Sequence, residues 1–405
     1  MNRSSSKHTG VFSAACLAMG FMVSPLSMPV AGNSAGVLGY SLLWLLPVAA
    51  LINFYTVNRY STILLPQPEL RPNATGPRFQ TGIAVLQVLA FPPFCIAAST
   101  LILAAAGYVF NEVFVRWFPN LLFSVCFLVF IVAVNLIGGK VSRFFQNCSV
   151  LLFLGSVLLL VLIGLFAIEK PLLGKVDVPG IISFEPRSVF MLFWIFMAAE
   201  LAVYHEKQGD DTQQPNPYFI ITAFAVVLAV FWLWLLISIA AAPPSALAES
   251  TGPQNIAAHF IAGGTGRMIM GAALLAGSFA GVNTLLQGTG SVLNIMLSPA
   301  ARRWRLSEKA IARKRFTMIL SLFILAMLLG GMAGKDITFT IMRAAFYLWL
   351  ITYAGYNLHI LRIHAASGIT ASMAAGIAVS VLYIAAFVIL VATDQQVKEV
   401  IFFLR

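Results

Sequence analysis

The sequence predicts an all-α polytopic membrane protein with a single transmembrane domain. Hydrophobic residues make up 60% of its 405 positions and charged residues only 10%, a balance that excludes a water-soluble globular protein. Apolar runs of about 20 residues, the length that a bilayer core of about 30 Å requires, recur along the whole chain. The segments between them are short, so no stretch is long enough to form a separate soluble domain.

Eleven apolar runs are candidate transmembrane helices. They lie near 11–31, 36–57, 81–108, 121–138, 147–168, 188–204, 217–241, 268–297, 316–333, 337–361 and 368–393. The charged start of the chain is similar to that of a signal peptide, but a second long apolar run follows almost at once. No convincing small-x-small cleavage site precedes that second run, so we expect the first helix to be retained.

The placement of Lys and Arg predicts the orientation in the membrane. If the N-terminus is cytoplasmic, the cytoplasmic side holds Arg59, Lys140, Arg143 and the cluster RRWRLSEKAIARKR at 302–315, while the opposite side has only scattered cations. Because cytoplasmic loops carry the excess of positive residues, we expect a cytoplasmic N-terminus in the cell (inner) membrane. The net charge of +11 then reflects topology and attraction to anionic lipid headgroups rather than a nucleic-acid surface.

Motifs of enzyme chemistry are absent from the sequence. GGKVS and MAGKDIT contain a Gly-Lys pair but lack the glycine spacing of a phosphate-binding loop, and there is no HExxH, paired CxxC or GxSxG. The five histidines lie in different segments and the four cysteines lie in or beside apolar runs, so we predict no metal site, disulfide or cofactor. GxxxG spacings at Gly277–Gly281 and Gly330–Gly334 predict close helix packing.

The first span carries helix-breaking and polar residues where burial is deepest. In GFMVSPLSMP, Pro25 removes a backbone donor and clashes with the carbonyl four residues earlier, and Ser24 and Ser27 flank it. Backbone polar groups freed at that depth are tolerated only if they are buried in protein or line a cavity. We therefore expect either a ligand-binding break or a simple proline kink that the two serines satisfy.

Charged residues inside later spans form a second group of candidates. Glu200 lies roughly 18 Å along the sixth span, near the midplane, where a carboxylate is costly unless it is protonated or paired. It is either a functional group or a neutral side chain that joins helices by a hydrogen bond. Arg343 is about 9 Å from the outer end of its span, so we expect it to snorkel to the surface. Phe91-Pro92-Pro93-Phe94 predicts either another interruption that faces the same centre or a packing kink.

The broken first span and the span of Glu200 each open a group of five. Two inverted five-helix repeats, each with a discontinuous first helix, form a known transporter architecture that binds substrate at the midplane. We place these repeats at 11–168 and 188–361, with a peripheral helix at 368–393.

Three segments carry a resemblance to a known family. FWIFMAAELAVYHEKQGDDTQQPNP resembles the sixth helix and following loop of the amino acid–polyamine–organocation (APC) superfamily permeases, which show a gating aromatic and an F-x-G-x-E motif. Trp194 matches the aromatic, Phe196 and Glu200 match the motif, and Ala198 replaces its glycine. NLIGGKVSRFFQNCSVLLFL resembles the fifth helix of the family. LLAGSFAGVNTLLQGTGSVLN resembles the eighth, with Asn283 in a family-like place.

The first span departs from the family pattern. Its permeases usually break this helix at a glycine-rich run whose amides bind a substrate carboxylate. Here Gly20 is kept, and SPLSMP at 24–29 replaces the other glycines. The MPVAG sequence at 28–32 also resembles the hydroxy/aromatic amino acid permease group.

The resemblance implies a leucine-transporter-like fold and a secondary transporter, a permease or exchanger, of amino acids or related small amines. Its expected substrate site is lined by Ser24, Pro25, Ser27, Trp194, Phe196, Ala198 and Asn283. Sodium sites of this architecture use paired hydroxyls on the eighth helix, where Ser278 stands alone. Some proton-coupled relatives place a lysine in the fifth helix, which this chain lacks, so we favour proton coupling through Glu200 or uncoupled exchange. The alternative is a transporter-like protein without transport, acting as a sensor or membrane-assembly partner.

Overall fold

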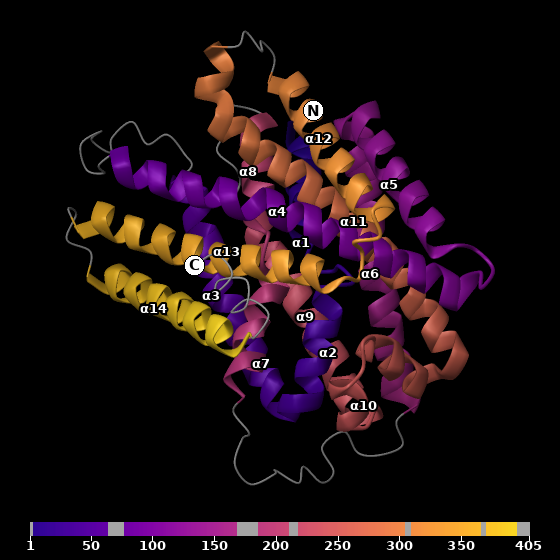
Figure 1. Cartoon of the computed structure of the whole chain (residues 1–405). Coiled ribbons are helices and arrows are strands. Elements are labelled where there is room, and N and C mark those ends of the chain that lie inside the picture. The colour runs from indigo at the N-terminus through magenta and orange to yellow at the C-terminus, as the bar shows by residue number, and fades with distance from the viewer. Residues whose placement is uncertain are drawn as a thin grey trace.

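The computed structural model describes residues 3–63, 77–167, 185–209, 218–303, 309–365 and 370–394, and in these residues all regular structure is helical (Figure 1). The helices of the first half are α1 (Arg3–Met19), α2 (Ser27–Leu38), η1 (Gly39–Ser41), α3 (Leu42–Ile63), α4 (Pro77–Val109), η2 (Phe110–Phe114), α5 (Asn120–Ile137) and α6 (Gly139–Ala167). Those of the second half are α7 (Pro186–Met191), η3 (Leu192–Phe196), α8 (Glu200–Gly209), α9 (Tyr218–Ala241), α10 (Pro244–Ala248), α11 (Pro253–Arg303), α12 (Lys309–Leu329), α13 (Asp336–Ala365) and α14 (Thr370–Thr393).

The membrane-spanning character of these helices agrees with the sequence. Within the described residues, nine segments are long and apolar enough to cross a membrane, and Ser27–Tyr60 is one of them as a single run. Gly10–Met19 is a shorter apolar helix. Each of the eleven ranges predicted from the sequence overlaps a helix of the structure. The predicted all-helical, multi-pass architecture is therefore confirmed.

Helix α11 lies at the centre of the bundle, where it packs against α6, α4, α8 and α12 (Figure 1). It bends at Ala262 and Gly263, whose backbone angles are not helical, and the predicted span at 268–297 falls after this bend. Helix α4 continues through Pro92 and Pro93 without interruption, so the alternative of a broken third span is wrong. The last helix, α14, packs mainly against α13 and touches α7, which places it at the edge of the bundle.

The two GxxxG spacings have different outcomes. A Cβ atom at Gly277 would lie 2.2 Å from the carbonyl oxygen of Val23, and one at Gly281 would lie 2.9 Å from Cβ of Ser24. Only glycine lets α11 approach the first span this closely, so packing at this pair is confirmed. At the second pair the prediction is wrong, because α12 ends at Leu329 and Gly334 lies in a turn with φ of 84°.

Arg343 also departs from its prediction. Instead of snorkelling to the surface, its guanidinium lies 3.2 Å from the carboxylate of Asp394, at the end of α14. The Tyr347 hydroxyl donates to the same carboxylate at 2.8 Å. Asp394 is buried, so this ion pair fastens α14 to α13 at one end of the molecule.

Candidate functional site

The first span is broken, as its sequence predicts. Helix α1 ends at Met19 and α2 begins at Ser27, and the residues between them form turns. Ser24 N–H donates to the Phe21 carbonyl at 3.0 Å and the Ser27 hydroxyl donates to the same carbonyl, also at 3.0 Å. Pro25 is buried within this segment. The Ser27 side chain thus satisfies backbone that the break exposes, whereas the Ser24 hydroxyl is left for another partner.

The sixth span is broken as well, between η3 and α8. Met197 is extended, with ψ of 169°, and Ala198 has φ of 66°. Ala198 is the one non-glycine residue with positive φ in the part of the chain that the structure describes. Within those residues, neither Ala198 nor Ala199 donates its N–H to a backbone carbonyl. A left-handed conformation favours glycine, which explains why the resembling permeases carry glycine at the position of Ala198.

The two breaks lie against one another. Helix α1 contacts α8 and α2 contacts η3, with no intact helix between them. The rings of Phe21, from the first break, and Trp194, from η3, have centroids 5.7 Å apart. Two discontinuous spans therefore meet inside the bundle, and the second of them leaves the Ala198 and Ala199 N–H groups without a backbone acceptor among the described residues.

Aromatic side chains fill the space around this junction. Phe94 of α4 packs against Phe21 at 5.4 Å, Trp194 at 5.2 Å and Trp349 of α13 at 4.8 Å. We call the group the aromatic cluster, and its members are Phe21, Phe91, Phe94, Trp194, Phe346 and Trp349. All of them are buried. The cluster connects both breaks to α4 and α13, the two helices that cover them.

Two buried donors at this junction have no hydrogen-bond partner among the described residues. They are the Ser24 hydroxyl and the indole Nε1 of Trp194, whose side chains are 0% and 2% exposed. Buried polar groups in proteins are nearly always paired, so such orphans call for an explanation. Cβ of Ser24 lies against Gly281 of α11 and the Trp194 ring lies against Phe21, so an acceptor group that entered at either place would satisfy the donor there.

Glu200 is the first residue of α8 and is fully buried beside the aromatic cluster. Its Oε1 accepts from Trp349 Nε1 at 2.5 Å and its Oε2 accepts from the Tyr353 hydroxyl at 2.6 Å. Both donors are neutral and both come from α13. Trp349 therefore belongs to the aromatic cluster through its ring and to the Glu200 carboxylate through its N–H.

Asn283 lies in a different polar group. Its Nδ2 donates to Gln146 Oε1 at 2.8 Å, and its Oδ1 accepts from Asn135 at 2.8 Å and from Gln287 at 3.0 Å. We call this group the amide cluster, and its members are Asn135, Ser142, Gln146, Asn283 and Gln287. It joins α5 and α6 to α11. The structure therefore does not bring Asn283 to the junction of the two breaks.

The amide cluster also holds the end of α1. Gln146 Nε2 donates to the Cys16 carbonyl at 3.0 Å, and the Thr284 hydroxyl donates to the Leu17 carbonyl at 2.9 Å. Ser278, by contrast, donates to Leu274 within its own helix. Side chains of α6 and α11 thus satisfy carbonyls at the C-terminal end of α1, just before the break.

A family model described as "Amino acid permease" matches residues 10–297. The chain belongs to the amino acid permease family. The family resemblance predicted from the sequence is confirmed at this level, and the chain is a multi-pass transporter rather than an enzyme. No curated protein matches the chain.

Solved structures place this permease in the leucine-transporter-like fold. MhsT in complex with L-phenylalanine is 14% identical, with a TM-score of 0.57, and the match covers 93% of this chain and 97% of that one. A Na⁺-coupled sialic acid symporter is 12% identical, with a TM-score of 0.58 and coverage of 93% and 89%. A manganese transporter of Eremococcus coleocola is 13% identical, with a TM-score of 0.50 and coverage of 97% and 96%. At this identity the similarity establishes the fold, which confirms the predicted class.

The predicted site residues lie in three settings, which are the junction of the breaks, the contact of Phe196 with α9, and the amide cluster that contains Asn283. Ser24, Trp194 and Ala198 lie at the junction of the breaks, with Ser24 and Trp194 unpaired. Phe196 stacks on Phe224 of α9, with ring centroids 5.7 Å apart, and so packs the segment before the second break against α9. The aromatic partners from α13 were missed by the sequence reasoning. Their only signal is aromatic residues in an apolar span, which lipid-facing helices also carry.

Proposed function

We propose that this amino acid permease binds its substrate between the two helix breaks and moves it by alternating access. The observation that supports this most is that each break carries an unpaired buried donor, the Ser24 hydroxyl in the first and Trp194 Nε1 beside the second, and that Phe21 and Trp194 bring the breaks into contact. Discontinuous helices in transporters bind anionic substrate groups at half-helix N-termini and cationic groups at bare carbonyls. Both kinds of helix end are present here.

The helix ends orient a zwitterion. Helices α2 and α8 begin at the junction, at Ser27 and Glu200, and their N-terminal ends carry partial positive charge that favours a carboxylate. Helix α1 ends there at Met19, and the partial negative charge of this helix end favours an ammonium group, although the Cys16 and Leu17 carbonyls already accept from Gln146 and Thr284. The rings of the aromatic cluster then surround the substrate side chain. They pack on one another in this structure, so binding requires them to separate.

Coupling is proposed to use a proton on Glu200, with uncoupled exchange as the alternative. Among the described residues, the groups that donate to the carboxylate are the neutral Trp349 and Tyr353, and no cation pairs with it there. A buried carboxylate of this kind is costly while ionised and loses that cost on binding a proton. Sodium is disfavoured because Ser278, the lone hydroxyl at its place on α11, is engaged with its own helix.

The orientation and the repeat boundaries remain predictions. A cytoplasmic N-terminus and repeats at 11–168 and 188–361 follow from the charge pattern and from the two breaks. The expected substrate site also retains Pro25, Ser27 and Phe196 as residues that shape the breaks. Cysteine-accessibility mapping tests the topology, and labelling of 302–315 from outside intact cells would overturn it.

Reconstituted transport tests the proposal directly. Purified protein in liposomes is offered a panel of labelled amino acids and amines, and uptake is measured with and without a pH or sodium gradient. We expect saturable, counterflow-competent uptake that Trp194→Ala reduces at least tenfold, while Trp44→Ala, a change on the exposed surface, leaves it intact. Binding without flux would instead support the alternative of a sensor.

A further inference from the structure

An apolar groove runs along the outside of the bundle between α5 and α12. It has a volume of about 260 Å³ and is lined by Leu128, Val129 and Val132 on one side and by Met318, Leu322 and Leu325 on the other. Val129 is 58% exposed and Leu322 is 63% exposed, so the groove opens outward. Nearly every lining group is aliphatic, which matches an acyl chain and offers nothing to a polar ligand.

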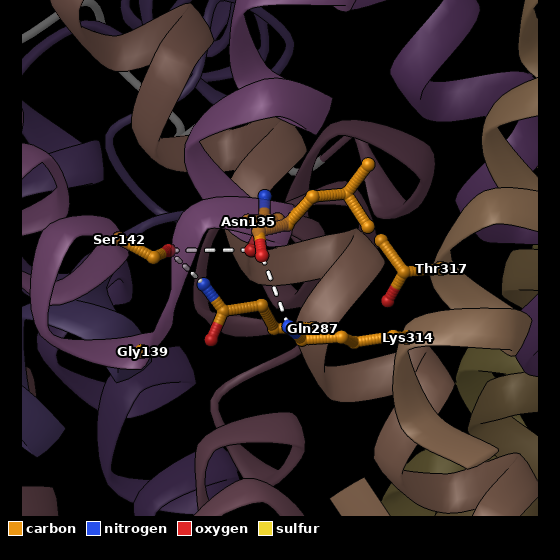
Figure 2. Close-up of a pocket in the computed structure, with 7 residues that line it drawn as sticks. Asn135, Gly139, Ser142, Gln287, Lys314 and Thr317 are labelled. Carbon is orange, nitrogen blue, oxygen red and sulfur yellow. Dashed lines mark hydrogen bonds between the residues drawn. The ribbon is translucent and has the colours of Figure 1, made fainter. Parts of the chain in front are cut away.

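The groove ends at a polar cavity of about 20 Å³, shown in Figure 2. Leu136 lines both, so the two are adjacent. The cavity is lined by Ser142 and Gln287 of the amide cluster and by Lys314 and Thr317 of α12. Lys314 Nζ donates to the Leu136 carbonyl at 3.0 Å. An ammonium group has three donors, so this bond leaves Lys314 able to bind an anionic oxygen at the end of the groove.

Cations gather at this end of the groove. Lys314 and Arg315 are exposed on α12, and Lys140 and Arg143 are exposed on α6 beside cavity residues. Among the described residues beside the cavity, Glu206 is an acidic side chain that interacts with Arg143. In the described part of this region, exposed positive charge therefore exceeds negative charge, which complements an anionic headgroup.

The length of the groove matches one leaflet. From Lys314 to Leu325 the helix rises roughly 16 Å, about half of the 30 Å core of a bilayer. The cation at one end of the groove complements a phosphate at the membrane interface. The apolar remainder of the groove complements an acyl chain in the membrane core. We propose that the α5–α12 groove binds an anionic phospholipid, with one acyl chain in the groove and the headgroup phosphate at Lys314.

The position of this site links it to the core of the bundle. Ser142 and Gln287 line the cavity and also belong to the amide cluster, which holds the end of α1 through Gln146. A headgroup at Lys314 therefore lies against the helices that fasten α1. Bound lipid adds contacts at this junction of α5, α6, α11 and α12, whose helices also pack directly on one another.

The test uses the full-length protein, purified and delipidated in detergent. Phosphatidylglycerol and phosphatidylcholine with identical acyl chains are titrated while thermal unfolding and native mass spectra are recorded. We expect phosphatidylglycerol to bind more tightly and to raise Tm further. Lys314→Gln should weaken its binding about fivefold, the effect of one cation near an anionic headgroup. The control Lys335→Gln removes an exposed cation from the turn at the opposite end of α12 and should change nothing.

A second pair of variants tests the groove itself. Ala133→Trp places an indole in the groove from its exposed wall and should abolish the Tm shift, whereas Ala378→Trp on the exposed face of α14 should not. If Ala133→Trp does not purify as a monodisperse protein, Leu322→Trp fills the groove from α12 instead. Equal shifts with both lipids, a full shift in Lys314→Gln, or an equal shift with glycerol phosphate alone would each overturn the proposal.

Discussion

The left-handed Ala198 allows a sharp test of why the sixth span breaks. Replacing a buried helical alanine with glycine normally costs about 1 kcal/mol in helix propensity and about 0.8 kcal/mol for the lost methyl group. At Ala198 the first cost is absent, since φ is 66° and the residue lies outside both helices. Glycine there also relieves about 1–2 kcal/mol of left-handed strain, which offsets the lost methyl and the greater entropy of the unfolded chain. We expect Ala198→Gly to change stability by less than about 1 kcal/mol.

The matched control is Ala202→Gly, four residues after Ala198 and within α8. Ala202 is also 0% exposed but lies inside the helix, so the same substitution should cost about 2 kcal/mol. Reversible unfolding of both variants by SDS in mixed micelles measures the two free energies side by side. A loss at Ala198 equal to that at Ala202 would refute the conformational argument, because it would show that the lost methyl alone decides.

Three further predictions follow from the buried polar contacts. Glu200→Gln should give uptake with no pH dependence, measured in liposomes between pH 5 and pH 8, and sodium-driven uptake that ignores pH would contradict proton coupling. Gln146→Leu removes the donor to the Cys16 carbonyl and should speed maleimide labelling of the buried Cys16 at least tenfold, whereas an unchanged rate would show that the amide cluster does not hold α1. Arg343→Gln removes the guanidinium 3.2 Å from the buried Asp394 carboxylate and should cost about 3 kcal/mol of stability, and a loss below about 1 kcal/mol would show that this ion pair contributes no more than an exposed one.

The features predicted correctly from the sequence are those that follow from the chemistry of a single residue in a membrane span. A proline flanked by serines in a charge-free run requires a break, and a carboxylate deep in a span requires a protein environment. Membrane physics alone imposes both. The break at Ala198 carries no such signal in its own residue, because alanine is a good helix former. The glycine of the resembling permeases and the five-span spacing of the two inverted repeats pointed to it.

Features that depend on which helices are neighbours could not be predicted. Asn283 follows Gly281 by two residues, or about 200° around the helix, so it faces away from the first break that Gly281 touches. The sequence shows that Asn283 is polar and inside a span, but not which helix lies behind α11. Arg343 pairs with Asp394, a residue of another helix far along the chain, and no local pattern connects them.

Trp349 supplies a physical link between substrate and proton in the proposed mechanism. Its ring packs on Phe91 and Phe94 with centroids 4.2 Å and 4.8 Å away, and its Nε1 donates to Glu200. A substrate that enters the aromatic cluster must displace rings that now touch one another. Movement of the indole changes the hydrogen bond that stabilises the ionised carboxylate, and so changes the free energy of binding a proton. Substrate binding in the aromatic cluster and protonation of Glu200 are then coupled directly through the side chain of Trp349.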